Sequence, residues 1–107
     1  PWGYYEILAE DEKFKVKKIT VNPWGRLSLQ SHKLRSEVWT IIEGEGVVTI
    51  NDHVATYKAH DVIKIAVTDI HRIHNQTDMP LVFVEVQHGL YFGEDDIIRY
   101  EDDYNRK

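Results

Sequence analysis

The sequence predicts an all-β fold, a sandwich or barrel of roughly seven to nine short strands. Apolar and polar residues alternate with period two in several segments, and turn residues separate these segments at a regular spacing. Of the 107 residues, 42% are hydrophobic, which suffices for one sizeable core and argues against disorder. We therefore expect a single domain over residues 1–107.

The first predicted strands show the alternation most clearly. Residues 14–21 read FKVKKITV, with every second residue on the same face. The NPWG sequence at 22–25 predicts a turn. Residues 26–32, RLSLQSH, alternate again and place Gln30 and His32 on the face opposite the leucines.

The later strands are separated by equally clear turns. The EVWTII strand ends at EGEG, and Asn51 with Asp52 predicts a two-residue hairpin turn. The acid-rich tail, residues 94–104, is most simply a solvated cover strand or turn, and it is the one segment with room for a helical turn. The remaining predicted strands cover residues 37–42, 47–50, 53–57, 61–67, 71–75 and 80–89.

Composition excludes several classes of function. A formal net charge of -5 disfavours a nucleic-acid backbone or an anionic membrane as partner. The absence of cysteine excludes disulfides and thiolate metal sites and suits a cytoplasmic protein. No signal peptide or membrane span is visible. The chain starts at Pro1 without an initiator methionine, so we expect a trimmed chain or a piece of a longer one.

Four polar residues form a candidate metal site. Gln30 and His32 are two apart on a predicted strand and share a face, Glu37 begins the next strand, and His71 opens a later one. Imidazole and carboxylate groups suit zinc or another divalent first-row ion, and a carboxamide oxygen can complete the set. The alternative is a group of polar residues on a half-solvated sheet.

Two motifs resemble those of the cupin superfamily. Residues 24–44 read W-x5-Q-x-H-x4-E-x6-G, beside the family's Gly-x5-His-x-His-x3–4-Glu-x6-Gly. Residues 60–75 read H-x5-A-x-T-x2-H-x3-N, beside Gly-x5-Pro-x-Gly-x2-His-x3-Asn. Gln30 thus stands at the first His position, and the glycines and the proline of the second motif are replaced.

A closer resemblance covers almost the whole chain. PWGYYEIL, LSLQSH, RSEVW, HRIHN, VEVQHG and YFGEDDIIRYEDDY are similar to the type II mannose-6-phosphate isomerase family. In that family the cupin domain often follows a mannose-1-phosphate guanylyltransferase domain. The 107 residues have neither the length nor a glycine-rich phosphate loop for that second activity. The resemblance implies a cupin barrel, a double-stranded β-helix, that commonly forms a homodimer.

The resemblance also implies a reaction and a ligand set. The family interconverts mannose 6-phosphate and fructose 6-phosphate by proton transfer through an enediol, within GDP-mannose and polysaccharide precursor metabolism. Position by position, the metal ligands would be Gln30, His32, Glu37 and His71. Zinc is the first expectation because type I isomerases use a Gln-His-Glu-His set, and manganese, cobalt or nickel are alternatives.

Two departures put catalysis in doubt. The family typically reads QxHxHRxEHW where this chain reads QSHKLRSEVW, so Leu34 and Val38 replace two histidines. Arg35 is retained and is a candidate for binding the substrate phosphate, because a guanidinium gives bidentate geometry. Its alternative role is a surface ion pair with Glu37 or with the acidic tail.

Two further polar residues lie on predicted apolar faces. Lys17 shares its face with Ile19 and Val21, so it could contact phosphate or act as a base, unless it is an edge lysine. Glu85 shares its face with Phe83 and is our first candidate for the catalytic base, unless it is a rim carboxylate.

Three functions therefore remain open. The first is a metal-dependent isomerase that acts on a sugar phosphate. The second is a catalytically silent cupin that binds a sugar phosphate or sugar nucleotide, or regulates a partner enzyme. The third is a dimerisation fragment of a larger polypeptide.

Overall fold

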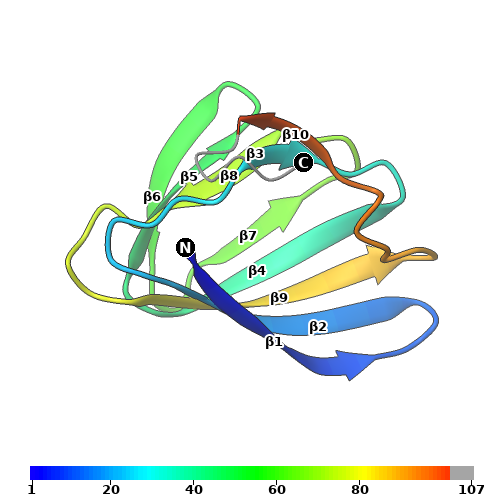
Figure 1. Ribbon diagram of the computed structural model, residues 1–107, viewed down its shortest axis with the longest axis horizontal. Coiled ribbons are helices and arrows are strands. Elements are labelled where there is room, and N and C mark those ends of the chain that lie inside the picture. Colours follow the sequence, from blue (N-terminus) through cyan, green and yellow to red (C-terminus); the bar gives the residue numbers. More distant parts are fainter. Residues whose placement is uncertain (102–107) are drawn as a thin grey trace.

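The computed structural model describes residues 1–101, which form two five-stranded sheets packed face to face (Figure 1). The first sheet has the strand order β1-β2-β9-β4-β7 and the second β10-β3-β8-β5-β6. All the pairings are antiparallel. No helix in residues 1–101 is long and apolar enough to cross a membrane. The strands are β1 (Gly3–Glu10), β2 (Phe14–Val21), β3 (Leu29–Ser31), β4 (Arg35–Glu43), β5 (Glu45–Ile50), β6 (His53–Lys58), β7 (Val62–Ile65), β8 (His71–His74), β9 (Leu81–Gly89) and β10 (Ile98–Glu101).

The architecture confirms the predicted all-β class and adds two strands. β1 was not predicted, because its apolar residues do not alternate and nearly all of it is exposed. Its structure comes from pairing with β2 along most of both strands, with one irregularity between Ile7 and Ala9. The tail was expected to be a cover strand or a turn, and its described part contains a hydrogen-bonded turn at residues 94–95 followed by a strand, but no helix. Residues 98–101 form β10 because the free edge of β3 offers backbone partners, and residues 102–104 lie outside the described residues.

One predicted strand is shorter than expected. Of residues 26–32, only Leu29–Ser31 are extended in a sheet, and Arg26 makes an isolated bridge to His74. The pairing of β3 with β8 consists of the single partner pair Gln30 and His71. His32 therefore lies in the connection to β4 rather than on the strand.

Polarity rises along the inner face of the first sheet. Ile19, Phe83 and Ile41 are buried and belong to the hydrophobic core, whereas the neighbouring rows hold charged and amide side chains. Directly opposed residues of an antiparallel sheet point to the same side. Across β2, β9 and β4 the successive rows are Ile19–Phe83–Ile41, Lys17–Glu85–Trp39 and Lys15–Gln87–Glu37. The barrel interior therefore has an apolar end and a polar end.

Three turn residues at motif glycine positions adopt a left-handed backbone. Trp24, His60 and Thr68 have φ angles of 64°, 79° and 71°. This conformation favours glycine, which is the residue that the cupin motifs place at these three positions. The turns of the fold are thus kept although the glycines are lost.

Candidate metal centre

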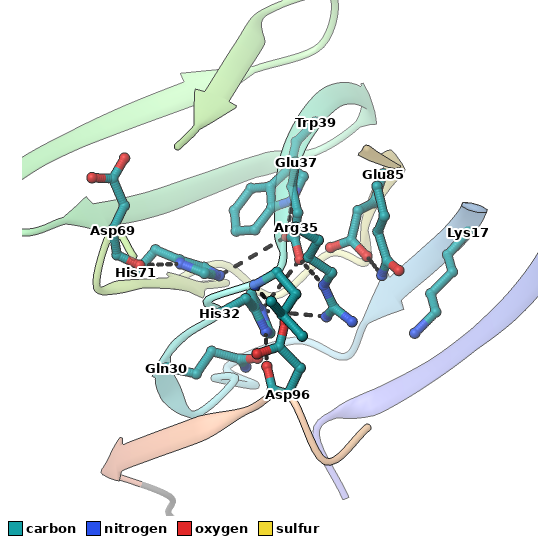
Figure 2. Close-up of polar contacts among 12 residues, drawn as sticks. Lys17, Gln30, His32, Arg35, Glu37, Trp39, Asp69, His71, Glu85 and Asp96 are labelled. Atoms are coloured by element: carbon teal, nitrogen blue, oxygen red, sulfur yellow. Dashed lines mark hydrogen bonds and ion pairs between the residues drawn. The ribbon is translucent and has the colours of Figure 1, made fainter. Parts of the chain in front are cut away.

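Three side chains from different elements converge at the polar end of the barrel (Figure 2). His32 follows β3, Glu37 lies on β4 and His71 begins β8. Their exposed fractions are 3%, 2% and 3%, so all three are buried. One ligand atom from each lies within 4.8 Å of the others. This group is hereafter the His–Glu–His cluster.

Backbone carbonyls fix the orientation of both imidazole rings. The Nδ1 atom of His32 lies 2.8 Å from the carbonyl oxygen of Asp96, and that of His71 lies 2.9 Å from the carbonyl of Asp69. A carbonyl can only accept, so Nδ1 carries the hydrogen in both rings. Nε2 then presents its lone pair to Glu37, at 3.3 Å from Oε2 for His32 and 3.9 Å from Oε1 for His71.

The electrostatics of the cluster call for a cation. Burial, followed by the charge of Arg35, lowers the pKa of His32 from 6.5 to about 4. Burial also lowers the pKa of His71. Both rings are therefore neutral near pH 7, and two nitrogen lone pairs face a carboxylate. Neutral imidazole and carboxylate are the donors that zinc and similar ions take, so these residues fit a divalent metal.

Glu37 is held by two donors. The indole Nε1 of Trp39 donates to its Oε1 at 2.9 Å, and Nε of Arg35 donates to its Oε2 at 3.1 Å. Arg35 is only 4% exposed, so the alternative of a surface ion pair is excluded, although its pairing with Glu37 is present in the interior. Nη2 of Arg35 also lies 3.3 Å from Nε2 of His32.

Glu85 lies beside the cluster and is buried, which excludes the rim alternative. Nε2 of Gln87 donates to its Oε2 at 2.6 Å. Burial, together with the neighbouring charge of Glu37, raises its pKa from 4.5 to about 8. A carboxyl group with a pKa near neutrality can both give and take a proton at physiological pH.

Lys17 points into the same space from β2, directly opposite Glu85 in the register, so it is not an edge lysine. Its side chain is 8% exposed. Nζ lies 3.7 Å from Oε2 of Glu94 and 4.3 Å from the centre of the Tyr5 ring. Figure 2 shows Lys17 on the side of Glu85 away from the histidines.

Gln30 lines the cavity as well, but its amide nitrogen donates to Ser28 Oγ at 3.0 Å. This bond leaves the carboxamide oxygen as the atom that a metal would use. Gln30 pairs with His71 on one side and with Arg99 of β10 on the other. These three residues therefore form a row that faces the first sheet.

Sequence reasoning missed Asp96, which joins the tail to the cluster. Its carbonyl fixes His32, and its two carboxylate oxygens accept the backbone N–H groups of Lys33 and Leu34 at 3.0 and 2.9 Å. The only available signal was the family-specific GEDDIIR sequence, which gave no role to any one residue. Asp96 thus shapes the loop that carries the first histidine of the cluster.

The two residues that replace family histidines do not face the cavity. Leu34 is 55% exposed and does not line the cavity. Val38 lies between the inward-facing Glu37 and Trp39 on β4 and is paired with Lys64 and Val86, so it faces outward. The substitutions therefore remove no group from the cavity itself.

A cavity of about 650 Å³, including its open mouth, is lined among others by Lys17, Gln30, Arg35, Glu37, His71 and Glu85. Its lining is richer in cations than the acidic chain as a whole. Four basic side chains, Lys17, Arg35, Arg72 and Arg99, stand beside three acidic ones, Glu37, Glu85 and Glu94. With Glu85 largely protonated at neutral pH, the lining is net positive.

The two packed antiparallel sheets have the cupin fold, the double-stranded β-helix. The fold is shared with a protein from Klebsiella pneumoniae that has a double-stranded β-helix domain, with a TM-score of 0.82 and 21% identity over 94% of this chain and 85% of that one. The cupin domain of Schizosaccharomyces pombe Cnp3 gives a TM-score of 0.77 and 15% identity over 79% of this chain and 63% of that one. Both comparisons confirm the predicted cupin fold.

The chain belongs to the mannose-6-phosphate isomerase C-terminal family, whose model matches residues 1–102. It is 42% identical over 106 residues to the xanthan biosynthesis protein XanB of Xanthomonas campestris and to the alginate biosynthesis protein AlgA of Pseudomonas aeruginosa. The matches cover 99% of this chain but 23% and 22% of those proteins. The chain thus spans less than a quarter of their length.

Proposed function

We propose that the protein is a metal-dependent isomerase that converts mannose 6-phosphate to fructose 6-phosphate, in the cytoplasm, for GDP-mannose and polysaccharide biosynthesis. The observation that supports this most directly is the His–Glu–His cluster beside a buried carboxyl group of raised pKa. The net positive cavity suits a phosphate ester, and family membership supports the choice of sugar.

His32, Glu37 and His71 would hold the metal, with the carboxamide oxygen of Gln30 as fourth ligand. A divalent ion there would polarise the sugar carbonyl and stabilise the developing oxyanion. Zinc is the first candidate, followed by manganese, cobalt and nickel.

Glu85 would move the proton between C1 and C2, and its pKa of about 8 makes either direction accessible. Gln87 holds its carboxyl group in place by the 2.6 Å hydrogen bond. Lys17 and Arg35 would bind the phosphate and exclude competing orientations of the sugar.

A coupled assay that detects fructose 6-phosphate tests this proposal, with each of the four metals added to metal-free protein. We expect turnover in wild type and in Glu43→Gln, which removes an exposed carboxylate at the end of β4. Glu85→Gln should lower kcat by about 100-fold or more, since general acid–base catalysis contributes that much. Absence of turnover with every metal would contradict the proposal.

A catalytically silent cupin remains the second candidate, because Leu34 and Val38 depart from the family pattern. Both side chains point away from the cavity, which favours the isomerase over this candidate. The double substitution Leu34→His with Val38→His separates the two. Recovered turnover from an inactive wild type would show that these two positions alone silenced the protein.

We also propose a homodimer formed through the first sheet. β1 is an edge strand with four large hydrophobic side chains exposed, Tyr4, Tyr5, Ile7 and Leu8. Such an edge is a template for pairing with another strand. Light scattering should give twice the chain mass, and Ile7→Lys should shift it towards a monomer. A monomeric wild type at high concentration would contradict this proposal.

A further inference from the structure

The guanidinium of Arg35 contacts the atoms through which His32 and Glu37 would bind a metal. Its Nε lies 3.1 Å from Oε2 of Glu37, and its Nη2 lies 3.3 Å from Nε2 of His32. The same Oε2 and Nε2 atoms lie 3.3 Å from each other. Figure 2 shows the guanidinium between the cluster and Lys17.

The chemistry of His32 makes these contacts incompatible with metal ligation. Its Nδ1 donates to the carbonyl of Asp96, so Nε2 has a single lone pair and no hydrogen. Nη2 of Arg35, which can only donate, uses that lone pair. A metal bound by His32 needs the same lone pair, so Arg35 must leave His32 before the metal can bind.

Without a metal, Arg35 compensates the buried negative charge of Glu37. The carboxylate of Glu37 is 2% exposed, and a buried charge without a partner is costly. The guanidinium neutralises it. Nη1 of Arg35 is buried and has no hydrogen-bond partner within residues 1–101, so the guanidinium is not fully satisfied in this position.

We propose that Arg35 is an internal counter-cation that competes with the metal and, once displaced, is transferred to the phosphate of the incoming substrate. Metal binding then frees a guanidinium that already lines the cavity, and a phosphate monoester stabilises it in the displaced position. By linkage, an anionic ligand raises the affinity for metal and the metal raises the affinity for the anion. The inference rests on the metal site of the proposed function but not on turnover.

The test measures binding of Co²⁺ to metal-free protein by calorimetry, alone and with inorganic phosphate, mannose 6-phosphate or neutral mannose. Either phosphate should tighten Co²⁺ binding by at least about fivefold, the lower end of usual allosteric couplings, whereas mannose should not. Arg35→Met should bind Co²⁺ more tightly than wild type without phosphate, and its gain from phosphate should fall below about twofold. Lys64→Met, which removes an exposed cation opposite Val38, should behave as wild type.

Equal phosphate coupling in wild type and Arg35→Met, or weaker Co²⁺ binding by Arg35→Met, would overturn the inference. If Arg35→Met does not fold, nitrogen NMR of wild type decides, because Zn²⁺ must change the Arg35 side-chain signals together with His32 Nε2. Unchanged Arg35 signals would overturn the inference. If the protein turns over mannose 6-phosphate but phosphate does not tighten Co²⁺ binding, only the role of Arg35 is refuted. If phosphate tightens Co²⁺ binding but there is no turnover, only the isomerase proposal is refuted.

Discussion

Nε2 of His32 and Oε2 of Glu37 lie 3.3 Å apart inside the barrel, and neither atom carries a hydrogen in the neutral state of the ring. Two acceptors at this distance repel each other unless a cation or a hydrogen-bond donor serves both. Arg35 does so in the structure described, and a divalent metal would do so more strongly.

Replacing the carboxylate of Glu37 should therefore abolish tight metal binding. Glu37→Gln keeps the shape but removes the charge and one acceptor oxygen, and we expect Zn²⁺ affinity to fall by more than about 100-fold. That loss exceeds the 10–100-fold typical of losing a partner outside the ligand set. Calorimetric titration checks this, with Glu43→Gln as the matched control. A Glu37→Gln protein that binds Zn²⁺ like wild type would exclude this cluster as the metal site.

Asp96 should control the geometry of His32 from the tail. Asp96→Ala removes both acceptors for the backbone N–H groups of residues 33 and 34, at a cost of about 2–4 kcal/mol in unfolding free energy. The loosened loop should also lower Zn²⁺ affinity by about 10–100-fold. Nitrogen NMR of metal-free protein should show the Nδ1–H form of His32 in wild type and a mixture of forms in the variant.

The neighbouring acid provides the control for that experiment. Asp95 accepts from the hydroxyl of Tyr91 rather than from the loop that carries His32, so Asp95→Ala should leave the His32 signals unchanged. If both variants perturb His32 equally, the effect belongs to the tail as a whole rather than to Asp96.

The stability of the metal-free protein should change little between about pH 4.5 and 6.5 and fall between pH 6.5 and 8. The pKa of His32 is about 4 when folded and 6.5 otherwise, so the unfolded chain binds more protons between these values, and this contribution to stability falls by about 3 kcal/mol as pH drops through the window. Glu85 acts oppositely: with a folded pKa of about 8, it stays protonated while the unfolded chain ionises, so its contribution falls as pH rises from 4.5 to 8. The two contributions therefore oppose each other between pH 4.5 and 6.5, and that of Glu85 alone acts above pH 6.5.

Urea unfolding of wild type and Glu85→Gln across this pH range separates the two contributions. Glu85→Gln cannot ionise, so its stability should stay level between pH 6.5 and 8 while that of wild type declines. An equal decline in the stability of the variant would show that Glu85 does not cause the loss of stability above pH 6.5.

Thr68→Gly should stabilise the protein. A β-branched residue at φ 71° costs about 1–2 kcal/mol, and glycine removes that strain while adding about 0.5–1 kcal/mol of chain entropy to the unfolded state. We expect a net gain of about 0.5–1 kcal/mol, measured by urea unfolding. The same change in a regular strand, Thr49→Gly in β5, should destabilise. A destabilised Thr68→Gly would mean that its side chain makes a compensating contact.

Much of the fold could be predicted because its signals are local. Residues 14–21 alternate without interruption, and the structure places β2 at the same boundaries. β1 was not predicted, because its stability comes from pairing with the neighbouring strand rather than from a buried face. His32 was placed on a strand with Gln30, whereas it reaches the cluster through a loop held by distant backbone groups.

The candidate site, like the fold, could be predicted only in part from the sequence. Residue chemistry and family motifs brought His32, Glu37 and His71 together, and the structure places them within one cluster. Asp96 acts on His32 through a backbone carbonyl, which every residue type possesses, so no side-chain pattern could reveal it. The internal pairing of Arg35 depends on the depth of burial, which a sequence does not contain.

The position of Asp96 has a consequence for synthesis of the chain. The four candidate ligands, residues 30 to 71, leave the ribosome before the residue that fixes the orientation of the first of them. A nascent chain that ends before residue 96 therefore contains every candidate donor atom but lacks the backbone carbonyl that orients His32. Metal loading should accordingly be a late event, which follows translation of the tail rather than accompanying formation of the first hairpins.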